Sequence, residues 1–557
     1  MKSRLILLSF IILHLSISPA GAQSWVKKAA KSVFTLKTFD EQGTLLANAG
    51  GVFIGERGEA ISCFAPFRGA SSAVVIDASG KEWPVEVILG ANDTYDVVKF
   101  RVGIKKSQPL AMANETATEG ATVWMLPFRE VKQAKNAVVR RAETFNKDYA
   151  YYTVNLQLTQ EETGMPLLSD AGFLLGLMQQ PTSASDSLNY AVSALFADSL
   201  KMSGLSINDP TLRSTKIKKA LPTDFSQAQL TLFVAGSTLD SAAYVQLIDD
   251  FIAQFPNEQD GYITHAQFAA GNDNYADADK DMEHALKVAA KPDEVHYSYS
   301  RIIYQKQLFR PEPPYEPWTL DRALAEAVAA YDANPMPVYK QQQAYVLFGQ
   351  KKYEEAASVY ETIFNSSLRS PDLFFEASRC KLMQADTLGY IALLDSAVAQ
   401  FSRPYLKEAA PFILARAQAR LDAGKYRDAA ADLNDYEQLM AAQVNDRFYY
   451  LRFQAEQGGR LFQQALNDIS KAIQINPQQE LYYAEKASLE VRVGLYNEAM
   501  QTAQECIRVA PEYSDGYLFL GLTQCLKGNK TEGIKNLQHA KELGDEQADG
   551  LIEKYGK

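Results

Sequence analysis

Histidine and cysteine are scarce in this sequence. The chain has four cysteines, widely spaced and without a CxxC pair, which excludes a disulfide-rich scaffold and, with so few histidines, predicts no metal site and no cofactor. Cys506 and Cys525 could form a disulfide in an oxidising compartment if they lie on adjacent helices, or they could be two buried small apolar residues. Residues 23–200 contain no histidine, because the five in the chain are His14, His265, His284, His296 and His539.

Long apolar runs and an excess of positive charge are also missing. Beyond the first 22 residues no stretch approaches the ~18 consecutive apolar residues of a membrane-spanning helix, so no transmembrane segment is expected after export. A net charge of −11 and a pI near 5.2 argue against nucleic acid, whose phosphates need a cationic footprint, and against strongly anionic membranes. The acidity by itself indicates no particular partner.

The N-terminus has the three-part pattern of a secretory signal. Two basic residues, Lys2 and Arg4, precede the apolar run Leu5–Ile17, and the small residues Ala20–Ala22 follow it. This order predicts a signal peptide over residues 1–22 that is cleaved before Gln23. No cysteine follows the small residues, so lipid attachment is not expected. The mature protein is therefore predicted in the periplasm of a Gram-negative bacterium, or fully secreted.

Residues 23–200 consist of short β-branched and aromatic runs broken by Gly, Asn and Asp. Many short runs at regular spacing are typical of an all-β barrel or sandwich. The next segment, 201–225, contains Gly204, Pro210, Pro222 and the basic stretch Lys216–Lys219, which favour a linker. The predicted strands are Ser32–Thr38, Gly51–Ile54, Ala73–Ile76, Trp83–Leu89, Val97–Val102, Thr122–Leu126, Tyr151–Gln157 and Phe173–Met178.

From residue 226 to residue 557 the composition shifts to Ala, Leu, Tyr, Gln and Glu, and an internal repeat appears. Its small anchoring residues lie 33 to 37 residues apart except for one step of 45, which predicts antiparallel helix pairs that approach closely at each anchor. The long step contains Pro311–Trp318, which we expect to project as a loop. The anchors are Ala243, Ala278, Ala323, Ala356, Ala392, Ala429, Ala465, Ala499 and Gly533.

The turns before these anchors share a G-x-Y/F-x-x-A-like pattern, clearest in Gly424–Ala429 and Gly494–Ala499. A proline follows some anchors by 12 residues, as Pro477 and Pro511 do. The period, the small residues and the terminal proline together resemble the tetratricopeptide repeat (TPR). The resemblance implies an all-α superhelical solenoid of about eight or nine helix pairs over residues 226–557.

A TPR solenoid presents the first helix of each pair on its concave face, so the resemblance also implies a protein or peptide partner there. Tyr and Arg are frequent energetic anchors of interfaces. The same residues could equally be solvated positions on the helix surface. The candidate peptide-binding residues are Tyr345, Arg447, Tyr450, Gln454, Ser488 and Arg492.

The β-rich segment carries a second resemblance. Ala49–Ile54, Gly58–Ser62 and Asp96–Val102 are similar, in order, to motifs of the trypsin-like serine proteases of the HtrA type, as are Gly164–Gly176 and Asn189–Val192. The resemblance covers about 170 residues and implies an all-β double barrel over residues 23–200. The expected fold is therefore a multidomain chain with a trypsin-like double barrel followed by a TPR solenoid.

The same resemblance assigns three catalytic positions, and two of them hold other residues. Ala65 stands where the family has its histidine, Thr163 stands where it has the nucleophilic serine, and Asp96 alone matches. Without an imidazole to take its proton, a hydroxyl is a poor nucleophile near neutral pH. The stretch Glu161–Met165 also keeps only one glycine and brings carboxylates to the place where negative charge would develop. We therefore expect a pseudoprotease domain.

Cys63 raises one alternative, because a thiol can replace the serine in such folds. No base is at hand to activate it, which favours a buried cysteine of the strand instead. The predicted function is an exported scaffold or adaptor that binds peptide or protein partners through its repeats, with a possible second peptide site on the inactive β domain. The alternative is a serine peptidase with unconventional residual activity, or a regulator of an active envelope protease.

Overall fold

The computed structural model describes residues 22–128, 134–181, 183 and 187–556. Almost all of the predicted signal peptide, residues 1–21, lies outside this part of the chain. The first described element is helix α1 (Ala22–Ala29), which begins at the predicted cleavage site. The chain divides into two compact units, Met1–Phe268 and Ala269–Lys557.

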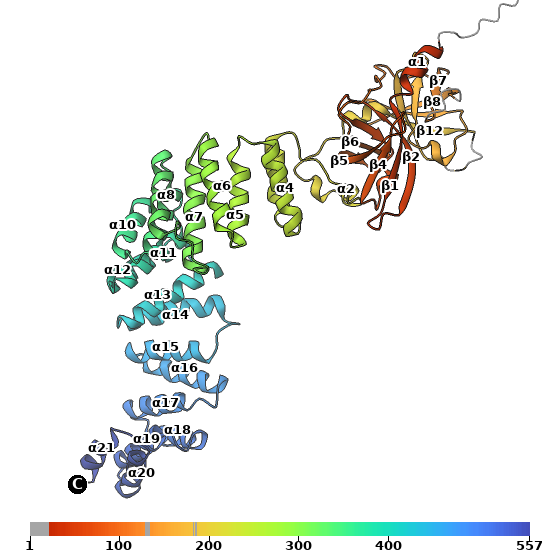
Figure 1. The fold of residues 1–557 in the computed structure, drawn as a ribbon. Coiled ribbons are helices and arrows are strands. Elements are labelled where there is room, and N and C mark those ends of the chain that lie inside the picture. Colours follow the sequence, from red (N-terminus) through yellow and green to blue (C-terminus); the bar gives the residue numbers. More distant parts are fainter. Residues whose placement is uncertain (1–21, 129–133, 182, 184–186, 557) are drawn as a thin grey trace, which may run out of the picture. The chain divides into compact units, whose positions relative to one another are not determined.

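The first unit contains two closed antiparallel barrels of six strands each (Figure 1). In the first barrel the strands follow the order β1-β2-β3-β6-β5-β4, and the second repeats this order as β7-β8-β9-β12-β11-β10. This confirms the double barrel that the sequence resemblance implies. The strands are β1 Val33–Phe39, β2 Leu45–Phe53, β3 Glu59–Ser62, β4 Ser72–Ile76, β5 Glu82–Asn92, β6 Val97–Val102, β7 Thr122–Met125, β8 Lys135–Phe145, β9 Tyr149–Val154, β10 Pro166–Ser169, β11 Leu174–Met178 and β12 Asn189–Ser193.

Strand β8 is the one strand that neither the apolar runs nor the protease motifs predict. Its sequence KNAVVRRAETF carries four charged side chains, and much of the strand is exposed. It nevertheless pairs with β7 and with β9, and it buries Val139 and part of Ala137 in the barrel core. A strand with one solvated face has too little apolar content to be recognised from composition.

The segment 201–225 is packed rather than free. Leu212, in the short helix α2 (Pro210–Arg213), and Ile217 are both 4% exposed and belong to the core of the first barrel. Farther along, Lys219 forms a parallel bridge with Ile88 of β5. Leu221 belongs to the core of the first helices instead. The segment predicted as a linker therefore connects the barrel to these helices through buried side chains.

The rest of the chain is helical, as predicted, and from α7 to α20 the helices pack in consecutive pairs (Figure 1). The even-numbered member of each pair carries the predicted anchor. The helices are α3 Phe225–Ala235, α4 Ser241–Gln254, α5 Gln259–Gly271, α6 Tyr275–Val288, α7 Asp293–Phe309, α8 Leu320–Ala333, α9 Pro337–Gly349, α10 Tyr353–Ile363, α11 Pro371–Met383, α12 Thr387–Val398, α13 Ala410–Asp422, α14 Tyr426–Met440, α15 Asp446–Gly458, α16 Phe462–Ile475, α17 Glu480–Arg492, α18 Tyr496–Val509, α19 Ser514–Leu526, α20 Lys530–Glu542 and α21 Ala548–Tyr555.

Most of the anchors lie buried, as a close helix crossing requires, but two do not. Ala243 on α4 and Ala392 on α12 are exposed, and Ile248 and Ile391 are the buried residues near them. Ile391 precedes Ala392 by one position, and one residue corresponds to a rotation of about 100° around a helix. An offset of one residue in the assigned anchor therefore selects a residue on the wrong face of the helix. The buried anchors are Ala278, Ala323, Ala356, Ala429, Ala465, Ala499 and Gly533.

The insertion Pro311–Trp318 was expected to project, and most of it does, although its aromatic residues pack against the repeats. Residues 311–314, 316 and 317 are exposed, whereas Trp318 is 1% exposed. The indole Nε1 of Trp318 donates a hydrogen bond to Asp279 Oδ1 on α6 at 2.7 Å, and the Tyr315 hydroxyl donates to Asp279 Oδ2 at 3.1 Å. An indole with a partner for its N–H gains more from burial than from exposure, so this part of the insertion packs onto the repeats.

Buried ion pairs recur with the period of the repeat. Arg416 on α13 holds Asp432 on α14 through two contacts of 2.6 and 3.1 Å. The equivalent pair 36 residues later joins Arg452 on α15 to Asp468 on α16 at 2.5 and 3.0 Å. All four side chains are at most 10% exposed. Bidentate guanidinium–carboxylate contacts of this kind orient the two helices of a pair.

The alternative of a disulfide between Cys506 and Cys525 is wrong in this structure, where both thiols are free and buried. Cys506 on α18 packs beside Gly516 at the start of α19, whereas Cys525 lies near the end of α19 and faces Gly533 on α20. Nine residues of helix separate Gly516 from Cys525, about 13 Å along its axis. A disulfide needs Cα atoms less than about 7 Å apart.

The crossing of α19 and α20 yields a test of the repeat packing. A Cβ on Gly521 would lie 2.7 Å from the carbonyl oxygen of Gly533. Gly521→Val should therefore force the two helices apart and cost about 1–3 kcal/mol, which corresponds to roughly 5- to 150-fold faster amide hydrogen exchange in α19 and α20. Hydrogen exchange followed by mass spectrometry measures this directly.

Gly550→Ala in α21 is the matched control, because a Cβ there meets no atom within 4 Å. It should leave exchange in α19 and α20 unchanged. Equal exchange in the Gly521→Val variant and the unaltered protein would show that the close crossing is not a packing constraint.

Candidate functional site

The positions that correspond to the catalytic histidine and aspartate lie in direct contact. Asp96 occupies the turn before β6 with a positive φ of 51°. Its Oδ1 accepts a hydrogen bond of 2.6 Å from the backbone N–H of Ala65, the first residue of the 3-10 turn Ala65–Phe67. The Ala65 side chain is a methyl group, so Asp96 here bonds to the backbone and orients no imidazole.

The electrostatics around Asp96 favour its neutral form. Burial raises the pKa of Asp96, and the hydrogen bond from Ala65 offsets only part of this effect. The adjacent thiol of Cys63 is fully buried and donates to the carbonyl oxygen of Met178 at 3.4 Å. Burial and the nearby Asp96 raise the pKa of the Cys63 thiol well above its ordinary value, so it remains protonated near neutral pH.

Thr163, at the position of the nucleophile, faces the first barrel. It is 6% exposed, and its Oγ1 is buried without a hydrogen-bond partner among the described residues. Its carbonyl oxygen accepts a hydrogen bond of 2.6 Å from the backbone N–H of Gly50 in β2. The next residue, Gly164, has φ 79°, and a Cβ there would collide with the Gly50 carbonyl. The single glycine that this stretch retains is therefore required by packing.

The backbone amides of residues 162, 163 and 164 already have acceptors. The N–H of Glu162 donates to Thr159 at 3.1 Å, and that of Thr163 donates to Gln160 at 3.2 Å, both within one 3-10 turn. The N–H of Gly164 donates to the Met178 carbonyl at 2.7 Å. Stabilising an oxyanion requires convergent N–H groups aimed at the reacting oxygen. In this geometry these three amides point at protein carbonyls instead.

Glu162 has a local structural role. Its carboxylate accepts from the backbone N–H of Thr159 at 2.9 Å in a capping box and pairs with Lys135 at 2.5 Å. The carboxylate is thereby held within its own turn.

Sequence reasoning missed a polar chain beside this site. The Tyr151 hydroxyl donates to the side-chain oxygen of Gln179, whose Nε2 donates to the Tyr95 carbonyl at 2.9 Å. Burial raises the pKa of Tyr151, with smaller contributions from Tyr190 and Asp96. No motif marks these residues in the sequence, because they come from separate strands and loops of both barrels.

The second candidate site is the surface of the odd-numbered helices in the repeats. Five of the six predicted peptide-binding residues lie on two of these helices: Arg447, Tyr450 and Gln454 on α15, and Ser488 and Arg492 on α17. Both arginines and the glutamine are exposed, whereas the tyrosine and the serine are half-buried.

The sixth predicted residue, Tyr345, lies apart from this group. It belongs to α9, where its hydroxyl accepts a hydrogen bond from Gln341 at 3.1 Å and its ring packs edge-on against Tyr360. Two helix pairs, α11/α12 and α13/α14, therefore lie between its own pair and that of Arg447 along the chain. The structure assembles the α15 and α17 residues on successive units and does not bring Tyr345 to them.

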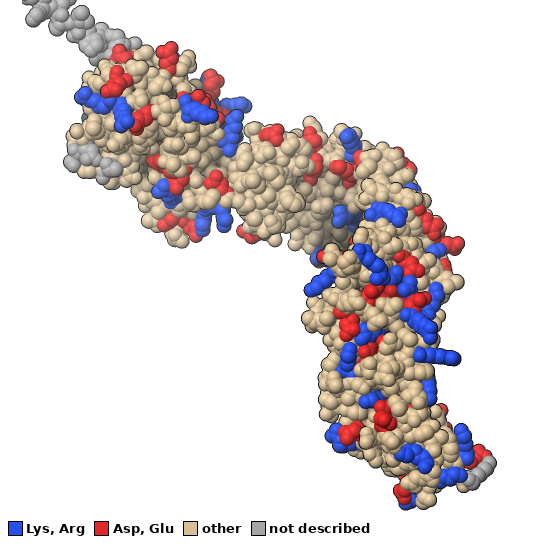
Figure 2. All heavy atoms as spheres, turned by 180° about the vertical axis from the view of Figure 1, so that it is seen from behind, with Lys and Arg blue, Asp and Glu red and all other residues tan. Residues whose placement is uncertain are grey.

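A missed acidic residue accompanies the α15–α17 group. The carboxylate of Glu485 on α17 accepts a hydrogen bond from the Tyr450 hydroxyl at 3.5 Å. The Tyr450 ring also packs against Tyr482, with 5.2 Å between the ring centroids. Burial raises the pKa of Glu485, and Arg492 acts in the opposite direction. The surface thus combines aromatic, cationic and acidic groups, and Figure 2 shows a similar mixture of both charges along the C-terminal repeats.

Two kinds of feature are missing from the residues that the structure describes. No group of three or more His, Cys, Asp or Glu side chains is arranged to hold a metal ion in this part of the chain. Across the same residues, none of the helices combines the length and apolar character that crossing a bilayer demands.

Comparisons with known proteins give partial likenesses. No protein-family model matches the chain. The small glutamine-rich tetratricopeptide repeat-containing protein 2 of Saccharomyces cerevisiae is 25% identical over 95 residues, which cover 17% of this chain and 28% of that protein. The chain thus matches well under two thirds of this relative's length.

Solved structures of proteases match the chain weakly. The active form of the Rv3671c protease from M. tuberculosis shares 18% identity over 37% of this chain and 89% of its own, with a TM-score of 0.29. A serine endoprotease from Yersinia pestis shares 14% identity over 33% and 65% of the chains, with a TM-score of 0.29. The HtrA-type protease AlgW with a tripeptide shares 15% over 31% and 60%, with a TM-score of 0.28.

TM-scores this low give no information about the activity of this protein. The strand order and the helix pairs of the structure themselves have the two-part architecture that the sequence predicts, a trypsin-like double barrel followed by TPR-like helix pairs.

The contact between Asp96 and Ala65 leads to a test with two variants. Asp96→Asn keeps an oxygen that accepts from the Ala65 N–H and removes the buried charge, so it should fold with equal or greater stability at pH 7. Asp96→Ala leaves that N–H without its partner and should cost about 1–3 kcal/mol. Amide hydrogen exchange of residues 59–70 reports both changes.

The pH dependence has a defined sign. Because the pKa of Asp96 is raised in the folded state, its contribution to stability is complete below its unfolded pKa and is lost as the pH rises through the folded pKa. The advantage of Asp96→Asn should therefore be present at pH 7 and vanish near pH 4. An Asp96→Asn variant less stable than the unaltered protein at pH 7 would contradict this role.

Proposed function

We propose that this protein is an exported binding scaffold that recognises peptide or protein segments with the α15–α17 surface of its repeats. The observation that carries the proposal is the grouping of Arg447, Tyr450 and Arg492 on two successive units, where the arginines are exposed and the tyrosine is half-buried. Tyrosine and arginine contribute strongly to binding when they are desolvated. The acidic Glu485 lies beside them. Its charge would favour peptides with a complementary basic group and would fix the position of the peptide along the surface.

The proposal includes a barrel domain that does not hydrolyse peptides. Three features support this part: residues 23–200 contain no histidine, the Thr163 hydroxyl is buried, and the amides of residues 162–164 are bonded to protein carbonyls. General-base activation and oxyanion stabilisation are the two largest contributions to this kind of catalysis. Both are lost together in this arrangement, and the domain acts as a structural or binding module.

Export is also part of the proposal. The basic, apolar and small-residue order of residues 1–22 supports it, and the predicted destination is the periplasm or the medium. The four free and buried thiols need no oxidising environment to fold, so the structure is compatible with either redox state.

Peptide binding tests the scaffold role. Full-length protein is screened against an array of short peptides, and the best peptide is titrated by calorimetry. Arg447→Gln, Arg492→Gln and Tyr450→Ala should each weaken binding by about 1–3 kcal/mol, roughly 5- to 150-fold. Each change lies on an accessible side chain and should leave the helical circular dichroism spectrum unaltered.

Arg508→Gln is the matched control, because Arg508 is an exposed arginine on an even-numbered helix, α18, where it pairs with Glu505. It should bind the peptide like the unaltered protein. A peptide whose affinity falls with Arg508→Gln and not with Arg447→Gln or Arg492→Gln would place the binding surface elsewhere.

A further inference from the structure

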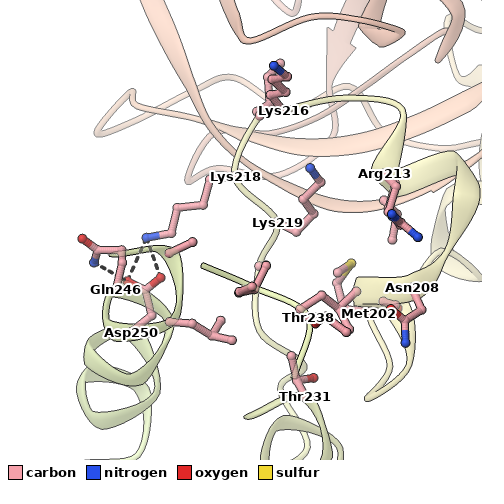
Figure 3. A pocket seen from close by; sticks show the side chains of 18 of the residues that line it. Met202, Asn208, Arg213, Lys216, Lys218, Lys219, Thr231, Thr238, Gln246 and Asp250 are labelled. Atoms are coloured by element: carbon pink, nitrogen blue, oxygen red, sulfur yellow. Dashed lines mark hydrogen bonds and ion pairs between the residues drawn. The ribbon is translucent and has the colours of Figure 1, made fainter. Parts of the chain in front are cut away.

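A cavity of about 850 Å³ lies in the first unit, where segment 201–225 meets the first helices. One wall is the extended stretch Thr215–Ala220, another is the loop from Met202 to Asn208, and α4 supplies a third (Figure 3). This volume falls within the ~300–1,000 Å³ of small-molecule sites. The cavity is lined by none of the candidate catalytic or peptide-binding residues.

The cavity has an excess of cationic side chains. Four basic residues line it, but Lys216 pairs with Glu41, and Lys218 pairs with Asp250 at 2.6 Å (Figure 3). The other two are Lys219 and Arg213. Within the described chain the Lys219 ammonium donates only to the Thr215 carbonyl, and the Arg213 guanidinium makes no hydrogen bond or ion pair. Two positive charges in the cavity therefore lack an anionic partner among the described residues.

Acidic residues at the cavity are already engaged. Asp250 neutralises Lys218, and Asp240 accepts the Ala243 N–H as the cap of α4. Burial lowers the pKa of Lys219, which reflects the cost of holding its charge without a counterion. An anion placed beside Lys219 would offset that cost, and a second cation at Arg213 adds long-range attraction.

The remaining walls are largely apolar. Met202, Ile207, Leu239 and Leu247 line the cavity together with Pro222. An apolar cavity with a few charged groups orients a ligand by its polar end and gains affinity from burial of its apolar part. The complementary molecule therefore carries a single negative group joined to an apolar group.

The extended stretch adds a backbone edge to this site. Lys216, Lys218 and Ala220 bond to residues 70 and 88 of the first barrel through their N–H or C=O groups. Successive residues of an extended strand direct these groups to opposite edges. The carbonyl of Ile217 and the N–H of Lys219 accordingly have no backbone partner within the described residues. They are free to bond to the polar end of a ligand or to the end of a chain.

We propose that this cavity binds a carboxylate joined to an apolar group, with the carboxylate on Lys219 and Arg213 and the apolar part against Leu239 and Leu247. A free aliphatic acid and the C-terminal end of a peptide with an apolar last residue share this chemistry. The site is separate from the α15–α17 surface and does not depend on the function proposed for it.

Calorimetry on the full-length protein distinguishes the two sources. The probes are octanoate with octanamide as its neutral match, and an acetylated tripeptide ending in leucine as its free acid and as its amide. At least one acid should bind with a Kd below about 1 mM, and its amide should bind at least tenfold more weakly. Binding of octanoate alone identifies a free acid as the source, and binding of the peptide acid identifies a chain end.

Three variants locate the site. Arg213→Gln and Lys219→Gln should each weaken the acid about tenfold, and glutamine at 219 retains a donor for the Thr215 carbonyl. Ala243→Phe, at an exposed position of α4 that lines the cavity, should fill the space and weaken binding at least as much. Lys201→Gln removes an exposed charge that does not line the cavity, and it should bind normally.

Two results would overturn the proposal. One is the absence of binding by either acid at 1 mM, or equal binding of acid and amide. The other is a loss of affinity in Lys201→Gln that equals the loss in Arg213→Gln. Equal losses would show that the acid responds to the net charge of the protein and not to a residue of the cavity. Ala243→Phe tests the same cavity without altering any charge, so the outcome does not rest on one variant.

Discussion

Hydrogen bonds that cross between the two barrels hold the first unit together at the place where a protease of this fold carries out its chemistry. The Gly50 amide bonds to Thr163 at 2.6 Å, and Cys63 bonds from the first barrel to the Met178 carbonyl of the second. The Gly164 amide shares that same carbonyl at 2.7 Å. Each of these contacts uses an atom next to a position that the protease resemblance assigns to catalysis, so the packing of the barrels constrains the same residues that a catalytic centre would use.

Asp96 lies beside these contacts between the barrels, and its surroundings differ from those of a catalytic aspartate. In a catalytic centre a carboxylate at this position stabilises an imidazolium, but here it interacts with the backbone N–H groups of residues 64 and 65, the Cys63 thiol and the Arg68 guanidinium. Its burial favours the neutral acid. A carboxyl group that bonds to the backbone of a turn supports the fold, so the role that we propose for Asp96 is structural. The binding functions that we propose lie instead on the odd-numbered helices and in the cavity beside segment 201–225.

Much of the architecture could be predicted because it depends on local patterns. The apolar runs and the protease motifs locate the strands except β8, whose exposed face carries Arg140, Arg141 and Glu143. The 33- to 37-residue period locates the helix pairs, and it fails at Ala392 only because a shift of one residue selects another face of α12. The motif alignment assigns Ala65 and Asp96 to neighbouring roles, and in the structure the two residues are joined by a hydrogen bond.

What could not be predicted depends on contacts between distant segments. The burial of Leu212 and Ile217 in the first barrel turns a segment with the composition of a linker into a packed part of the first unit. The free charges of Lys219 and Arg213 become apparent only once Lys216 and Lys218 are seen to pair with Glu41 and Asp250. The separation of Cys506 from Cys525 likewise reflects which end of α19 each thiol faces. No sequence spacing encodes these relationships.

Labelling of the purified protein with a fluorophosphonate probe, together with digestion of casein, tests whether the barrel domain is catalytically inactive. We expect no labelling and no cleavage, with the Thr163→Ala variant indistinguishable from the unaltered protein and an active trypsin-like protease labelled under the same conditions. Labelling of the unaltered protein that disappears in Thr163→Ala would contradict it, because it would show that Thr163 is an activated nucleophile despite its buried hydroxyl and the missing histidine.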